Sequence, residues 1–146
     1  MLKVGDQAPL FEADSTEGLI RLEDFIGKRP VVLIFYPMDE TPGCTAQLCA
    51  VRDNKKKYDA LGAVVIGVNP GTMKDHRLFA ERHGLDFPIA VDKDEQIRKL
   101  YDVGKILGLF LQQRIVYVID KQGRIVYAYK GSPPAEVLLE VILNSR

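Results

Sequence analysis

Cys44 and Cys49 are the two residues of this 146-residue chain whose type and position best support covalent chemistry. Cys44 follows an apolar run at residues 31–36 and the turn residues Pro42 and Gly43, so it lies at the expected start of a helix. The first turn of a helix carries partial positive charge and free N–H groups, which favour a thiolate over a thiol. The position therefore indicates a reactive thiol, with a small buried hydrophobic residue as the alternative.

Cys49 lies five residues beyond Cys44. In a regular helix this spacing separates the two Cα atoms by roughly 8–9 Å, whereas a disulfide requires less than about 7 Å. Two alternatives follow: Cys49 is an inert structural thiol, which the spacing alone favours, or the start of the helix unwinds so that the pair can bridge. Thr41 adds a hydroxyl group that we expect within reach of the Cys44 sulfur.

The composition excludes several classes of protein. Lys plus Arg and Asp plus Glu each number 20, so the formal charge is zero and no broad basic field is available for nucleic acid or an anionic membrane. No apolar run reaches the ~18 residues of a membrane span, and the first residues lack the apolar core of a signal peptide. Two cysteines are too few for a disulfide scaffold. We therefore expect a cytoplasmic protein with a single domain over residues 1–146.

Hydrophobic periodicity predicts alternating strands and helices along the chain. The predicted strands are residues 10–13, 19–22, 31–36, 63–68, 87–91, 115–119 and 125–129. The predicted helices are residues 44–61, 73–83, 95–101 and 133–143, the last capped by Ser132 with Pro133 at its first position. A parallel strand–helix–strand unit followed by a hairpin and a helix predicts an α/β sandwich with a mixed sheet.

The two histidines and a pair of acidic residues offer a second set of chemical groups. His76 and His83 are two helical turns apart on the predicted helix 73–83. That is about 10.5 Å along the axis, too far for one metal ion to bind both directly. We interpret His76 as a polar contact on a helix face and His83 as a residue near the helix end. The adjacent carboxylates Asp39 and Glu40 are expected to be solvated in their loop.

The sequence around Cys44 resembles the active-site signature of the peroxiredoxins. In that signature a proline is followed after three residues by a threonine, and the threonine is followed after two residues by the cysteine. Here these residues are Pro37, Thr41 and Cys44. The continuation through Cys49 to Asp53 is similar to the subgroup called PrxQ or bacterioferritin comigratory protein.

Further matches to this subgroup extend along the chain. They are residues 4–11, residues 22–27 and Arg114, which stands directly before the predicted strand 115–119. One departure is Gln47, where the family usually has glutamate. The resemblance implies a thioredoxin-like fold, with a central mixed sheet, flanking helices and an N-terminal hairpin, and it implies reduction of hydrogen peroxide and organic hydroperoxides.

The resemblance also implies roles for individual residues. Cys44 would be the peroxidatic nucleophile that becomes a sulfenic acid, and Cys49 the resolving cysteine that forms an intramolecular disulfide with it. Thioredoxin or a similar dithiol protein would reduce that disulfide. Thr41 and Arg114 would orient the peroxide and stabilise developing charge, and Pro37 would shield the pocket from water.

The backbone N–H groups of Gly43 and Cys44 would be extra donors to the peroxide. No metal or organic cofactor is implied, because sulfur carries both electrons. We expect a monomer or a weak homodimer.

Two other functions remain open at this point. A thioredoxin-fold oxidoreductase acting on protein disulfides is the first, although the chain has no C-x-x-C pair. A non-enzymatic binding module that docks a partner through the apolar residues 106–111 is the second. We expect residues 106–111 to be a buried helix or loop. The alternative is an exposed patch that forms an interface or favours bulky apolar hydroperoxides.

Overall fold

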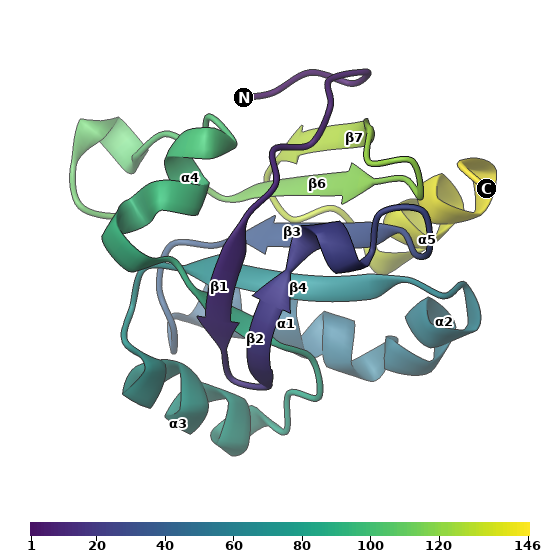
Figure 1. Cartoon of the computed structure of the whole chain (residues 1–146). Helices are drawn as coiled ribbons and strands as arrows, with labels where there is room; N and C mark the ends of the chain where they lie inside the picture. Colours follow the sequence, from purple (N-terminus) through teal and green to yellow (C-terminus); the bar gives the residue numbers. More distant parts are fainter.

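The computed structural model describes residues 1–146, and its centre is one seven-stranded sheet in the order β2-β1-β5-β4-β3-β6-β7 (Figure 1). Strand β3 (Val31–Phe35) pairs in parallel with β4 (Val64–Asn69) and antiparallel with β6 (Ile115–Ile119). The predicted mixed sheet is therefore confirmed. No helix in the structure combines the length and apolar character that crossing a membrane requires.

The remaining elements follow the predicted order closely. The other strands are β1 (Glu12–Ser15), β2 (Gly18–Arg21), β5 (Ile89–Val91) and β7 (Ile125–Lys130). The α-helices are α1 (Pro42–Asp53), α2 (Lys55–Ala60), α3 (Met73–His83), α4 (Gln96–Leu100) and α5 (Ala135–Asn144). Three short 3-10 helices are η1 (Leu22–Asp24), η2 (Lys93–Glu95) and η3 (Ile106–Gly108).

Strand β3 is buried along its whole length because both faces of the sheet are covered. Successive side chains of a strand point to opposite faces. Val32 and Ile34 accordingly pack in one core with residues of α1, α2, α3 and α5. Val31 and Leu33 pack in the other core with the N-terminal segment and α4, and Figure 1 shows α1 and α4 on opposite sides of the sheet. This burial explains why the strand is continuously apolar.

Two predicted helix boundaries were wrong. The helix predicted over 44–61 is two helices, since Asn54 has non-helical angles (φ −109°, ψ 11°) between α1 and α2. The last helix begins at Ala135 and not at Pro133, and Ser132 does not cap it. A proline disfavours helical angles in the residue before it, so Pro134 keeps Pro133 out of the helix.

Candidate active site

Cys44 lies in the first turn of α1, just beyond the carboxyl end of β3. The N-cap Thr41 has extended angles (φ −73°, ψ 145°), and Pro42 follows at the first helical position. Proline is well tolerated there because the first N–H groups of a helix have no partner within it. Cys44 is the third helical residue, and its side chain is 0% exposed. The thiol is thus buried at the positive end of a helix.

Arg114 is the charged group that contacts Cys44. Strand β6 runs antiparallel to β3, with Ile115 opposite Phe35, so the residue before β6 lies beside the end of β3. Arg114 Nη2 donates to Cys44 Sγ at 3.3 Å, and Nη1 donates to Gln47 Oε1 at 2.6 Å. Because the Gln47 amide is neutral, it orients the guanidinium without compensating its charge.

Gly43 allows the guanidinium to approach this closely. A Cβ atom built on Gly43 would lie 3.2 Å from Arg114 Nη2, which is tighter than ordinary contact. The N–H groups of Gly43 and Cys44 have no acceptor within the protein, whereas the next N–H, of Thr45, donates to the Thr41 carbonyl at 2.8 Å. The floor of the site therefore presents two free backbone donors beside the sulfur.

The Thr41 hydroxyl is placed differently from our expectation. It donates to the Met38 carbonyl at 2.9 Å and makes no hydrogen bond with the Cys44 sulfur. Pro37, two residues beyond the end of β3, is half-buried and lies in the loop that leads to Thr41. Both residues are close to Cys44 in the chain, but Arg114 is the residue whose side chain hydrogen-bonds the Cys44 sulfur.

Cys49 is half-buried and, like Cys44, is a free thiol. Both residues belong to the unbroken helix α1, so the spacing that prevents a bridge in a regular helix applies here.

The structure contains a buried polar network, next to the loop that leads into α1, that the sequence did not predict. Asp39 is not solvated: its carboxylate accepts from the Tyr36 hydroxyl at 2.6 Å and contacts His76 Nδ1 at 2.6 Å. His76 is fully buried, and its Nε2 contacts the Asn69 carbonyl at 3.1 Å. Burial raises the pKa of Tyr36 well above its usual range, and Asp39 adds to that effect.

Glu40 is also paired, contrary to the expectation of solvation alone. It binds Arg82 and, at 2.8 Å, His83 Nε2, both near the end of α3. The hydrogen bond from His83, with help from Arg82, lowers the pKa of Glu40. The sequence shows two consecutive carboxylates and two histidines on one predicted helix, but nothing in it indicates that they pair.

Residues 106–111 are mostly exposed, so the expectation of a buried helix or loop was wrong. Leu107 and Phe110 are each 88% exposed. Leu107 (φ 53°) and Gly108 (φ 69°) have left-handed angles, which turn the short helix η3 away from the core. Phe110 and Leu111 line a groove of about 580 Å³ together with Pro37, Met38 and Leu78.

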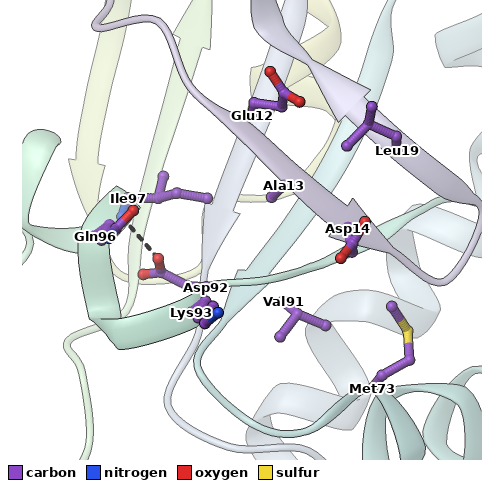
Figure 2. Close-up of a pocket in the computed structure, with 10 residues that line it drawn as sticks. All are labelled: Glu12, Ala13, Asp14, Leu19, Met73, Val91, Asp92, Lys93, Gln96 and Ile97. Atoms are coloured by element: carbon purple, nitrogen blue, oxygen red, sulfur yellow. Dashed lines mark hydrogen bonds between the residues drawn. The ribbon is translucent and has the colours of Figure 1, made fainter.

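A second cavity, of about 470 Å³, lies between β1, β5 and α4 (Figure 2). Its buried carboxylate, Asp92, accepts from the N–H groups of Ile97 at 2.7 Å and Arg98 at 2.9 Å. Both oxygens therefore cap the start of α4. Burial raises the pKa of Asp92, although these N–H groups oppose the shift. No cysteine lines this cavity, and we assign it no chemistry.

Comparison with known proteins identifies the family of the chain. The model of the AhpC/TSA family matches residues 4–128. The chain belongs to this family. It is 36% identical over 135 residues to Peroxiredoxin Bcp of Bacillus subtilis, a match that covers 88% of this chain and 85% of that relative.

A plant relative and a solved structure give the same result. The chain is 42% identical over 128 residues to the chloroplastic Peroxiredoxin Q of Triticum aestivum, covering 87% of this chain but only 58% of that relative, so it spans little more than half of its length. The crystal structure of Peroxidoxin BcpB from Mycobacterium tuberculosis superposes with a TM-score of 0.90 at 28% identity, covering 100% of this chain and 99% of that one. The resemblance to the peroxiredoxin Q and Bcp group, and the thioredoxin-like fold, are confirmed.

Proposed function

We propose that this chain reduces hydroperoxides with Cys44 as the peroxidatic nucleophile. The observation that carries the proposal is the buried sulfur at the N-terminus of α1 with Arg114 Nη2 at 3.3 Å. A helix N-terminus and a guanidinium both favour the thiolate, which is the form of cysteine that attacks. Burial of the sulfur in a polar, donor-lined position suits a reaction in which negative charge moves from sulfur to oxygen.

The first step oxidises Cys44. Its thiolate attacks one oxygen of ROOH, an S–O bond forms and the O–O bond breaks. The sulfur supplies the electron pair, and the departing RO⁻ takes up a proton to leave as water or an alcohol. Cys44 becomes a sulfenic acid, the first stage of thiol oxidation.

Four groups act on the peroxide in this proposal. The guanidinium of Arg114 and the free N–H groups of Gly43 and Cys44 stabilise charge developing on the two oxygens. The Thr41 hydroxyl turns from the Met38 carbonyl to the bound peroxide. Pro37 limits the access of water to the sulfur. No metal or organic cofactor takes part.

Cys49 resolves the sulfenic acid in the second step. Its sulfur attacks the Cys44 sulfur, an S–S bond forms, and the S–O bond breaks with release of water. Because both thiols lie on the intact helix α1, its first turn must open for them to meet. A thioredoxin-like dithiol protein then reduces the disulfide. The alternative reaction, exchange with protein disulfides, is not favoured because no C-x-x-C pair is present.

The remaining parts of the proposal concern the whole molecule. We propose a single domain over residues 1–146 that acts in the cytoplasm as a monomer or weak homodimer, without nucleic-acid or membrane partners. The zero net charge supports the absence of nucleic-acid binding. The plant relative is named as chloroplastic, so localisation of this chain in its own cell is a direct test.

Mass spectrometry of the intact protein after one equivalent of hydrogen peroxide tests the chemistry. The reduced protein should lose two hydrogens, as an intramolecular disulfide requires. Cys49→Ser should instead gain one oxygen, and Cys44→Ser should do neither. Reduced, folded protein that stays unmodified would contradict the proposal.

A further inference from the structure

The segment that leads into α1 is held to helix α3 by both of its acidic residues. Asp39 contacts His76 at 2.6 Å, and Glu40 binds Arg82 and His83. His76 and His83 are the only two histidines of the chain. Both therefore contact the residues that immediately precede the Cys44 helix, although they are some forty positions away in the sequence.

The contact between Asp39 and His76, which we call the anchor, is buried and fully hydrogen-bonded. The side chains are 9% and 0% exposed. The Asn69 carbonyl can only accept, so His76 Nε2 donates to it, while Nδ1 faces the Asp39 carboxylate, which also accepts from the Tyr36 hydroxyl. Hydrogen bonds that involve a carboxylate are short and strong.

The same region of backbone is held by side-chain amides and is locally strained. Asn69 Nδ2 donates to the carbonyls of Tyr36 and Pro37, at 2.8 and 3.1 Å. Glu40 has a left-handed backbone (φ 66°), a conformation that non-glycine residues adopt only when their surroundings hold them there. Release of the segment from α3 would let Glu40 relax, and relaxation moves the backbone directly before α1.

We propose that the anchor sets the rate at which the Cys44 sulfenic acid meets Cys49, by holding the first turn of α1 closed. Asp39 and His76 are positioning residues here. The inference rests on the proposed function and deepens it. The first helical bond, from the Thr45 N–H to the Thr41 carbonyl, must break when the turn opens. Thr41 is two residues from Asp39, so the anchor stabilises that bond through a very short piece of chain.

The test separates oxidation from disulfide formation by rapid mixing. Asp39→Asn keeps the shape of the side chain but removes its charge, and it should raise the population of the open form about tenfold. Disulfide formation should then be about tenfold faster. Oxidation by peroxide should change by less than about twofold, because the closed form still dominates.

Asp92→Asn is the matched control, since Asp92 is also a buried carboxylate but caps α4 on the other side of the sheet. It should lower stability without accelerating disulfide formation. Glu40→Gln, at a more exposed contact, should also accelerate disulfide formation but by less. Unchanged or slower disulfide formation in Asp39→Asn, or equal acceleration in Asp92→Asn, would overturn the inference.

Hydrogen exchange of the Thr45 amide gives a readout that needs no peroxide. Protection of this amide in the reduced protein should fall about tenfold in Asp39→Asn and stay constant in Asp92→Asn. If protection falls in a protein that does not react with peroxide, the role of the anchor is supported and only the proposed peroxidase function is refuted. Unchanged protection would refute the anchor even where the peroxidase is active.

Discussion

Helices α1 and α3 begin in the same way but use their first turns for different purposes. Each has a threonine N-cap with extended backbone, Thr41 (φ −73°, ψ 145°) and Thr72 (φ −74°, ψ 157°). In α3 the Thr72 hydroxyl accepts from the N–H of Asp75, the third helical residue, at 3.1 Å. In α1 the third residue is Cys44, whose N–H has no partner; the Thr41 hydroxyl donates to the Met38 carbonyl and does not cap the helix.

The missing cap leaves the first N–H groups of α1 without partners, whereas the cap of α3 occupies one of them. A capping hydrogen bond contributes roughly 1 kcal/mol to the free energy of unfolding. Helix α1 lacks this bond, and its first N–H donors remain free. The carboxylate of Asp75 and the sulfur of Cys44 occupy equivalent places, where a helix favours negative charge. At the second position α3 carries the exposed Lys74, whereas α1 has Gly43 beneath the guanidinium of Arg114.

Replacing the nucleophile is the strongest test of this comparison. Cys44→Ser should lower peroxidase turnover by at least about 10³-fold, because a hydroxyl at this place stays protonated. Its unfolding transition should stay close to that of the parent. Turnover with a thioredoxin-like reductant, followed beside a thermal melt, measures both; substantial residual turnover would show that another group reacts.

Removing the guanidinium should have the next largest effect. Arg114→Ala should slow the first oxidation by about 10²–10³-fold, the usual cost of losing a donor to the developing charge. Arg114→Lys should recover only part of the rate, since an ammonium lacks the fork that reaches both Cys44 and Gln47. Stopped-flow oxidation measures these rates. A loss explained entirely by unfolded protein would remove Arg114 from the chemistry.

Gly43→Ala should separate stability from reactivity. Alanine favours a helix by up to about 1 kcal/mol over glycine, so the melting temperature should hold or rise. Its Cβ, however, would lie 3.2 Å from Arg114 Nη2 and displace it. We expect the oxidation rate to fall about tenfold, as for one lost charge-assisted hydrogen bond. Lys74→Ala in α3 is the control and should leave the rate alone.

Replacing the two N-cap threonines should have the smallest effects on stability and rate. Thr72→Val should cost about 1 kcal/mol of unfolding free energy, because it removes a working cap. Thr41→Val should cost less stability than this and instead slow the oxidation. Urea unfolding and oxidation rates of both variants make the comparison; equal stability losses would mean that Thr41 also stabilises its helix.

Cys44 could be predicted as a reactive residue because the turn residues Pro42 and Gly43 mark a helix start directly after an apolar strand. Pro37 and Arg114 were expected in the site only from the resemblance to the peroxiredoxins. The central strands could be predicted from the sequence as well. A strand such as residues 115–119 is buried on both faces and is therefore continuously apolar.

The rest depends on tertiary contacts that no local pattern contains. Asp39 and His76 are distant in sequence, and only the packing of α3 beside the end of β3 brings them together. Residues 106–111 are apolar, but composition alone does not decide burial, and the left-handed backbone at Leu107 turns them outward.

The contact between Arg114 and Cys44 has a consequence for timing. The hydrogen bond to sulfur is strong while the sulfur is an anion and weak once it is neutral. Formation of a sulfenic acid that is protonated cancels that charge, and Gln47 offers no substitute counter-charge to the arginine. In the proposed mechanism, the attraction that keeps the sulfur in its pocket therefore fades as soon as the oxidant has been consumed, just when the side chain has to move toward Cys49.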